Sequence, residues 1–383
     1  MRKYLSHLNS AVTILESYKG DIPFAHFIKK YFAQHKKYGS KDRKSIASIC
    51  YAYFRIGHAY KDLPLQERVL IAVFLMSDPL QDVLMACKPE WNNFHAPISE
   101  KLQSLQLAQE INIFPWKDAL SASIDALTFE RSHLQQPLLF LRARKGKENA
   151  LAQNCIKQNI PFQQGESSFA LSNGTSIDAL GQINRDFVVQ DISSQKVGEL
   201  LALIPLQNGP MKIWDCCAAS GGKSILAQDV FPAIELTVSD NRETILKNLH
   251  QRFREAGIRK YHSFQADLSL PLQRVPTYDL VIADVPCSGS GTWGRTPEQL
   301  CYFDIRTLEN FVTLQRKIIS QVVKTVKPGG YFLYITCSVF QAENEMQVAF
   351  LQKNLGLHLI QDNMIKGYEK QADSMYAALL YKK

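Results

Sequence analysis

The sequence predicts an α/β protein in which a doubly wound, mostly parallel sheet follows an all-α domain and a small α+β module. The first observation is that strand-like and helix-like stretches alternate through residues 201–383. The second is that three strand candidates end at cysteine, aspartate or glycine, where sheets of this kind place their chemistry. The third is helical spacing of apolar residues within residues 1–105.

Length and composition limit the class of protein. The 383 residues suffice for two or three domains, and 46% hydrophobic with 21% charged residues is ordinary for a globular chain. No apolar run approaches the ~20 residues of a membrane span, and the start lacks a signal-peptide pattern. None of the eight cysteines forms a CxxC pair, so we expect no metal and a reducing, cytoplasmic location. The net charge of +8 permits a polyanionic partner.

Residues 1–105 are expected to form a helical domain. Apolar residues recur at helical spacing from Ile46 to Ile56. A basic cluster comes just before that predicted helix, formed by Lys36, Lys37, Lys41, Arg43 and Lys44. Two interpretations stay open: a solvated helix start, or a patch that contacts phosphates.

Residues 106–200 are expected to form the small α+β module. Leu138–Ala143 and Phe169–Ser172 are strand-like, and Glu148–Gln158 is helix-like. Basic residues surround the first strand, namely Arg142, Arg144, Lys145 and Lys147. An open sheet with a basic, aromatic face is one way to hold single-stranded RNA, and we keep that interpretation beside a purely structural one.

Residues 201–383 should contain the main sheet. The strand candidates are Met211–Trp214, Glu235–Val238, Tyr261–Phe264, Tyr278–Ala283, Tyr331–Ile335 and Met375–Tyr381. The helix candidates are Lys223–Val230, Arg242–Ala256, Ile305–Val326 and Ala342–Asn354. Because parallel strands end at one edge of a sheet, we expect Asp215, Asp284, Cys287 and Cys337 to converge on one pocket.

A glycine turn after the first of these strands indicates the cofactor. Its GGKS sequence resembles the end of a nucleotide-triphosphate loop, but Cys217 stands where that loop needs a glycine, and GxGxxG is absent. Asp240 follows Gly221 by 19 residues, at the end of the next strand candidate, where it could accept hydrogen bonds from ribose hydroxyls. S-adenosylmethionine fits a glycine turn that is followed by an acidic residue for the ribose and that lacks a diphosphate-binding signature. Each of these features alone is more often part of a plain strand–helix turn.

The motifs at these strand ends resemble those of the RNA (cytosine-5) methyltransferases of the RsmB/NSUN type. The family patterns D-x-C-A-A-P-G-G-K-T, D-x-P-C-S-G-x-G…R-x-P-E, Y-S-T-C-S…E-N-E and Q-D-x-x-S-Q match Asp215–Ser224, Asp284–Glu298, Tyr334–Glu345 and Gln190–Gln195. Ser220 and Ile335 depart from the patterns, replacing a proline and a serine. Residues 1–105 more faintly resemble the family's NusB-like helical domain.

The resemblance implies a Rossmann-like, S-adenosylmethionine-dependent methyltransferase domain and a role for each site residue. The Cys337 thiolate would add to carbon 6 of cytosine, Cys287 would assist removal of the proton at carbon 5, and Asp284 would hold the base. Lys223 would keep Asp284 and the thiolate anionic. The expected cofactor-binding residues are Cys217, Ala218, Ala219, Ser220, Gly221, Gly222, Lys223, Asp240, Asp267 and Asp284, with Asp267 at the adenine amino group.

The resemblance also implies an RNA partner, and rRNA is favoured over tRNA. We expect a monomer without a membrane partner or a metal. The alternatives are a tRNA cytosine-5 methyltransferase and a non-catalytic ribosome-assembly factor on the same fold. A DNA cytosine methyltransferase would use the Pro-Cys cysteine, Cys287, as its nucleophile; the second motif cysteine, Cys337, argues against it.

Overall fold

The computed structural model describes residues 2–76, 80–91, 95–105, 111–272 and 276–383. The chain divides into two compact units. The helical unit comprises Met1–Asp118, Asp125–Gln136 and Trp293–Ile305, and the α/β unit comprises Ala119–Ile124, Pro137–Thr292 and Arg306–Lys383. The predicted boundary at residues 105 and 106 adjoins a segment outside the described residues, so the division into 1–105, 106–200 and 201–383 stays a prediction.

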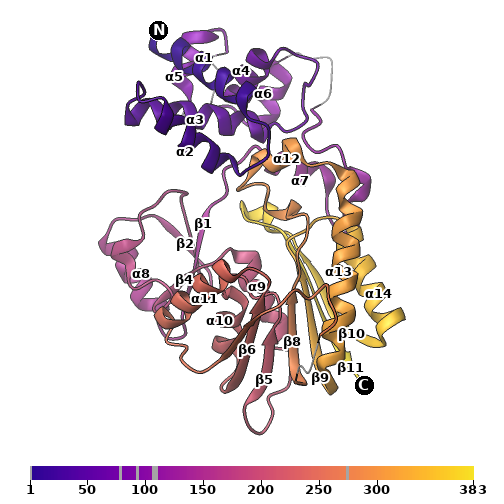
Figure 1. Ribbon diagram of the computed structural model, residues 1–383. Helices are drawn as coiled ribbons and strands as arrows, with labels where there is room; N and C mark the ends of the chain where they lie inside the picture. Colours follow the sequence, from indigo (N-terminus) through magenta and orange to yellow (C-terminus); the bar gives the residue numbers. More distant parts are fainter. Residues whose placement is uncertain (1, 77–79, 92–94, 106–110, 273–275) are drawn as a thin grey trace. The chain divides into compact units, whose positions relative to one another are not determined.

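The helical unit is built from short helices (Figure 1). They are α1 Arg2–Ser17, α2 Phe24–Gln34, α3 Ser40–Arg55, α4 Leu65–Met76, α5 Gln81–Cys87, α6 Ile98–Ser104, α7 Ala126–Ser132 and α12 Pro297–Tyr302. Helix α3 lies where apolar spacing predicts a helix, and it buries Ile46, Ile49 and Phe54. Asp42 in its first turn accepts a hydrogen bond from the Gly39 amide at 3.4 Å and so satisfies a free helix-start donor.

The basic cluster lies differently from the prediction. Helix α3 already begins at Ser40, so Lys41, Arg43 and Lys44 are in its first turns and do not precede it. Arg43 is half-buried and donates to the Tyr38 carbonyl at 2.9 Å. Lys36, Lys37, Lys41 and Lys44 are exposed, which leaves them available to a polyanion.

The main sheet of the α/β unit has the order β10-β11-β9-β8-β5-β6-β7 among the described residues. Its strands are β5 Met211–Asp215, β6 Ile234–Asp240, β7 His262–Gln265, β8 Tyr278–Asp284, β9 Val326–Thr336, β10 Leu357–Ile365 and β11 Met375–Lys382. Strands β5 to β9 run parallel, whereas β11 pairs antiparallel with β9 and β10. The predicted doubly wound, mostly parallel sheet is confirmed.

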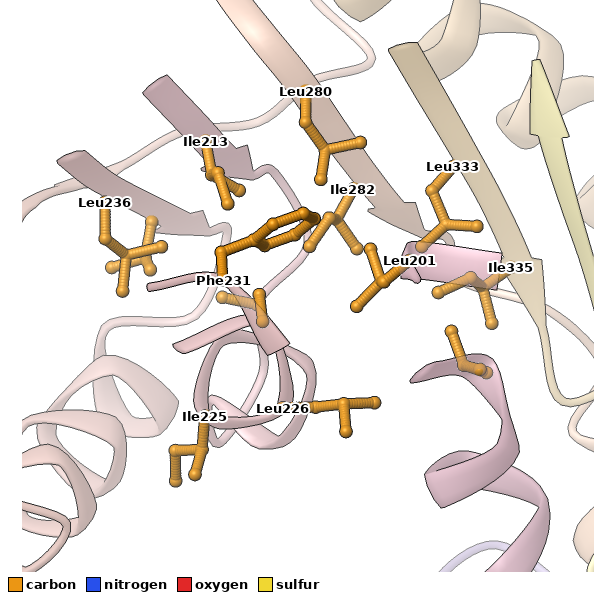
Figure 2. Packing of buried hydrophobic residues seen from close by; sticks show 14 of the residues in the cluster. Leu201, Ile213, Ile225, Leu226, Phe231, Leu236, Leu280, Ile282, Leu333 and Ile335 are labelled. Carbon is orange, nitrogen blue, oxygen red and sulfur yellow. The ribbon is translucent and has the colours of Figure 1, made fainter. Parts of the chain in front are cut away.

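Helices cover both faces of this sheet (Figure 1). They are α9 Ile192–Leu201, α10 Gly222–Val230, α11 Glu243–Glu255, α13 Leu308–Val322 and α14 Glu345–Leu355. One face packs on α9, α10 and α11 through alternate strand residues such as Ile213, Leu280 and Ile282, and Phe231 lies among them (Figure 2). Each fully buried Leu or Ile contributes about 1.5–3 kcal/mol, so this layer fixes the strand register.

The small sheet has the order β2-β3-β1-β4 and is antiparallel. Its elements are β1 Leu139–Ala143, α8 Glu148–Lys157, β2 Phe162–Gln164, β3 Ser168–Leu171 and β4 Phe187–Val189. Phe169 and Phe187 are fully buried in a cluster with Leu151 and Cys155 of α8. Val188, which points to the opposite face, belongs to the core of the main sheet. Phe169 and Phe187 are therefore part of the core, which favours the structural interpretation for these two aromatic residues.

Two of the basic residues around β1 form ion pairs within the α/β unit. Arg142 is buried and donates to Gln190 at 2.7 Å and to Asp229 of α10 at 2.5 Å. Arg144 pairs with the other oxygen of Asp229 at 2.8 Å. The two arginines hold the small sheet on α10, and the idea that they face RNA is wrong; Lys145 and Lys147 are exposed. In the part of the chain that the structure describes, no helix has the length and apolarity needed to cross a membrane.

Candidate active site

The motifs meet because their strands are neighbours. Strands β5, β8 and β9 lie side by side in the sheet and end at Asp215, Asp284 and Thr336. The register pairs Asp284 with Ile335, and the Val285 amide donates to the Ile335 carbonyl at 3.1 Å. The loops that follow β8 and β9 therefore start at the same level, as the sequence predicts.

These loops bring two cysteines into contact. The Sγ atoms of Cys287 and Cys337 are 3.3 Å apart, and both thiols are free. The Gly291 amide donates to the Cys337 carbonyl at 2.9 Å, and a Cβ at Gly291 would lie 2.0 Å from the Ser374 carbonyl oxygen. Only glycine allows the backbone this close approach. The hydrogen bond to Cys337, and burial next, raise the pKa of the Cys287 thiol well above its ordinary value.

Asp284 lies beside the cysteine pair on a chain of polar contacts. The Nζ of Lys223 in α10 lies 3.0 Å from its Oδ2 and 2.9 Å from the Ser194 Oγ. Ser194 in turn accepts from Gln190 Nε2 at 3.1 Å. Lys223 is buried and Asp284 is partly exposed. The ammonium therefore contacts the carboxylate from the interior, and the opposite side of the carboxylate stays open.

A cavity of about 440 Å³ opens at these strand ends. Its lining includes seven of the predicted site residues, Cys217, Ala219, Asp240, Asp267, Asp284, Cys287 and Cys337. Cavities of this size hold ligands such as nucleosides and cofactors. The lining does not include Ala218, Ser220, Gly221, Gly222 or Lys223.

The glycine turn between β5 and α10 forms one wall. Ala219 and Gly221 both have positive φ, at 45° and 83°. A Cβ at Gly221 would lie 2.5 Å from the Phe253 ring, so both the backbone and the packing require glycine. Ser220 accepts from Arg252 NH1 at 2.8 Å, and Arg252 also donates to Asn184. These contacts hold the turn where the family pattern has proline.

Asp240 and Asp267 supply acceptors on the other wall. Asp240 accepts from the Ala219 amide at 3.1 Å and from the Arg242 guanidinium at 3.0 Å. Arg242 is 57% exposed and so has room to move away from Asp240. Two hydrogen bonds from Ser269 lower the pKa of Asp267 and keep it ionised.

Comparison with known proteins finds a family match for part of the chain. The family model described as "16S rRNA methyltransferase RsmB/F" matches residues 201–381. These residues are similar to that family. The resemblance inferred from the motifs is thereby confirmed for this segment.

One curated relative is "Ribosomal RNA small subunit methyltransferase B" of Xanthomonas campestris pv. campestris, 32% identical over 44% of this chain. The chain spans 38% of that relative, and 52% and 61% of two others with the same name, from Salmonella arizonae and Shigella sonnei.

Two solved structures share the fold. The crystal structure of PH0851 is 17% identical and has a TM-score of 0.68 over 99% of this chain and 98% of its own. NSun6 from Pyrococcus horikoshii, solved with SFG, is 15% identical and has a TM-score of 0.57 over 70% of this chain and 97% of its own. At these identities the likeness shows the fold.

Part of the RsmB/F-type motif lies away from the cavity. Pro297 and Glu298 belong to the helical unit, where buried Glu298 accepts from the Phe24 amide at 3.2 Å. The last motif also has structural contacts, because Asn344 donates to Ser121 at 2.9 Å and accepts from Thr336 at 2.6 Å. Among the described residues, no group of three or more His, Cys, Asp or Glu side chains is placed to hold a metal.

Sequence reasoning missed several residues of the cavity. They are Cys216, Asn241, Arg242, Ala266, Leu268, Val285, Pro286, Leu314 and Ile318. Leu314 and Ile318 are four positions apart on α13, which places them on one helix face. That spacing was visible, but nothing in the sequence says which strand ends the face meets.

Proposed function

We propose that the protein transfers a methyl group from S-adenosylmethionine to carbon 5 of a cytosine in RNA through a covalent bond between Cys337 and the base. The observation that carries this proposal is the 3.3 Å contact between Cys287 and Cys337, at the ends of adjacent strands and beside Asp284. Amino-group methylation needs no such pair of thiols. A cytosine carbon needs one thiol to form a bond and a second group to help break it.

The proposed covalent step begins at Cys337. Its thiolate adds to carbon 6 of cytosine, which makes carbon 5 an enamine carbon able to attack a methyl group. Bound S-adenosylmethionine would supply that methyl group. Cys287 assists removal of the proton from carbon 5, the bond between carbon 6 and the Cys337 sulfur breaks, and the aromatic ring is restored. The contact with Cys337 is also the largest cause of the raised pKa of the Cys287 thiol, so protonation of one sulfur affects the other.

Asp284 and Lys223 act on the base in this proposal. The carboxylate of Asp284 accepts from the protonated ring nitrogen 3 and the amino group of cytosine, which stabilises the adduct. Lys223, 3.0 Å away, forms an ion pair with that carboxylate. Because Lys223 also contacts Ser194, its ammonium is held in place before a substrate arrives.

The residues of the cavity fit S-adenosylmethionine. Asp240 offers carboxylate oxygens to ribose hydroxyls, and Asp267 offers an acceptor to an adenine amino group. Leu268, Val285 and Pro286 add an apolar surface for the ring. The neighbouring fold of NSun6 was solved with SFG, an analogue of S-adenosylmethionine, which agrees with this assignment.

The proposed substrate is rRNA, and the proposed location is the cytoplasm. The curated relatives are named for the RNA of the small ribosomal subunit, and the net charge of +8 suits a polyanion. A tRNA substrate remains the alternative. The cytosine itself is not specified by any residue described above.

Methyl transfer from labelled S-adenosylmethionine to total RNA tests this function. We expect the label in RNA with the wild-type protein, no label with Cys337→Ala, and unchanged labelling with Cys87→Ala, a half-buried cysteine of the helical unit. Bisulfite sequencing of RNA from a strain without the protein should then show one or more lost 5-methylcytosines. RNA binding without any label, in protein that binds the cofactor, would point to the assembly factor and contradict the proposal.

A further inference from the structure

A buried carboxylate lies directly behind the two cysteines. Glu343, at the end of the 3-10 turn Gln341–Glu343, is 0% exposed. It accepts from the Ser288 amide at 2.9 Å, the Ser288 hydroxyl at 2.5 Å and the Ser338 hydroxyl at 2.5 Å. Gln315 of α13 donates a further hydrogen bond at 2.9 Å. The roles proposed above for Asp284, Lys223 and the cysteines do not involve this residue.

The partners of Glu343 flank the reactive thiols. Ser288 follows Cys287, and Ser338 follows Cys337, so one carboxylate joins the two cysteine loops. Gln315 extends the link, because its amide group also donates to the carbonyl of Pro286, on the other side of Cys287.

The negative charge of Glu343 needs an explanation beyond packing. A carboxylate removed from water is costly unless it is paired or well hydrogen-bonded, and the four partners described above are neutral. A glutamine could join the same loops without this cost. The charge therefore has consequences for its neighbours: after the hydrogen bond to Cys337, burial and the charge of Cys337, it adds to the raised pKa of the Cys287 thiol, and, after burial, it also raises the pKa of Tyr334.

We propose that Glu343 is a positioning residue, which holds the Cys287 and Cys337 loops together and keeps the shared proton of the two thiols on Cys287, so that Cys337 is the thiolate that adds to carbon 6. The inference rests on the proposed function. The charged and titratable groups around Cys287 are Cys337, Glu343 and the buried Tyr334 of β9. Asp284, which pairs with Lys223, lines the same cavity as Cys287. Of the two motif glutamates, Glu345 instead accepts from Ser121 at 2.9 Å.

The rate of iodoacetamide alkylation of Cys287, followed by mass spectrometry between about pH 6 and pH 10 in the full chain, tests the proposal. Glu343→Gln keeps the shape and removes the charge, so the pKa of Cys287 should fall by roughly 1 pH unit. At pH values well below the midpoint of the variant, Cys287 should then react about tenfold faster than in the wild type. Glu345→Gln, the matched control, should leave the profile unchanged. Identical profiles for Glu343→Gln and the wild type would overturn the proposal.

A second variant covers the case in which Glu343→Gln does not fold. Ser338→Ala removes one hydrogen bond between Glu343 and the Cys337 loop, which should loosen the thiol contact and also speed alkylation of Cys287. An unchanged rate in Ser338→Ala contradicts the proposal. Alkylation needs no RNA, so a shifted profile in a protein that methylates no RNA would support the positioning role while rejecting the proposed function.

Discussion

At the residue scale, Asp215 is the acid most strongly affected by burial at the strand ends. It is fully buried at the end of β5, where it accepts from the Ser224 hydroxyl at 2.6 Å. Burial raises its pKa to about 7, although the Ser224 hydrogen bond and the charge of Lys223 oppose that rise. Its second oxygen has no partner within the described residues, which is consistent with a carboxyl that keeps its proton.

The raised pKa of Asp215 predicts how stability depends on pH. The folded state binds the proton more tightly than the unfolded state, whose pKa is about 3.9, so stability is present at low pH and is lost as pH rises toward 7. Asp215→Asn should lack this loss. Between about pH 5 and pH 8, the unfolding free energy of the variant should gain roughly 2–3 kcal/mol relative to the wild type.

Urea unfolding at the two pH values measures this difference. The exposed Asp178→Asn controls for the change in net charge and should show no such gain. Parallel pH curves for Asp215→Asn and the wild type would mean that the Asp215 carboxyl titrates as it does in water.

At the element scale, the turn between β5 and α10 requires glycine for two separate reasons. Gly221 has a φ of 83°, and its Cα hydrogen faces the Phe253 ring of α11 so closely that a Cβ would lie 2.5 Å from that ring. Gly257 provides a matched comparison, because its φ is 77° but a Cβ there would meet nothing within 4 Å.

The comparison predicts unequal effects of the same substitution. Gly257→Ala should cost about 1 kcal/mol for the left-handed backbone alone. Gly221→Ala should cost a further 1–3 kcal/mol because Phe253 must move, and it should also weaken cofactor binding at the wall of the cavity. Chemical unfolding and calorimetry measure the two effects. Equal costs would show that Phe253 yields without strain.

Strong local signals explain which elements the sequence predicts. Strands β5, β8 and β9 are buried apolar runs that end in reactive residues, so both their presence and their convergence were predictable. Strand β4 has only three residues and is not among the predicted strands. Strand β10 was not predicted, because its apolar and polar residues do not alternate regularly. Much of this strand is exposed at the edge of the sheet. The contact of Arg142 with Asp229 was invisible, since it joins residues 87 apart.

At the scale of the whole molecule, the helical unit cannot be removed by cutting the chain once. It takes three segments of the chain, the last of which carries Pro297 and Glu298. A fragment starting at Gln190 would also lose Val188, which belongs to the core of the main sheet, and the Arg142–Asp229 pair. Surface substitutions in the intact chain are therefore the sounder test of RNA binding.

The test uses exposed lysines in the loop between α2 and α3 and in the first turns of α3. Replacing Lys37, Lys41 and Lys44 with glutamine should weaken RNA binding and reduce the slope of log affinity against log salt by up to about 2–3, because each phosphate contact contributes ~0.7–0.9. Cofactor binding should not change. The control replaces three other exposed lysines, Lys157, Lys324 and Lys353. Equal salt slopes in the two triple variants would mean that Lys37, Lys41 and Lys44 do not contact RNA and only form a solvated helix start.

The central claim is that Cys337 forms a bond to cytosine and Cys287 helps to break it, and denaturing electrophoresis of single cysteine variants with RNA and S-adenosylmethionine tests it most directly. Cys287→Ala should accumulate a protein–RNA adduct that survives denaturation, since addition still occurs and elimination stalls. Cys337→Ala and the double variant should form none. An adduct with Cys337→Ala and none with Cys287→Ala would reverse the roles, and no adduct with either variant would contradict covalent catalysis at this pair.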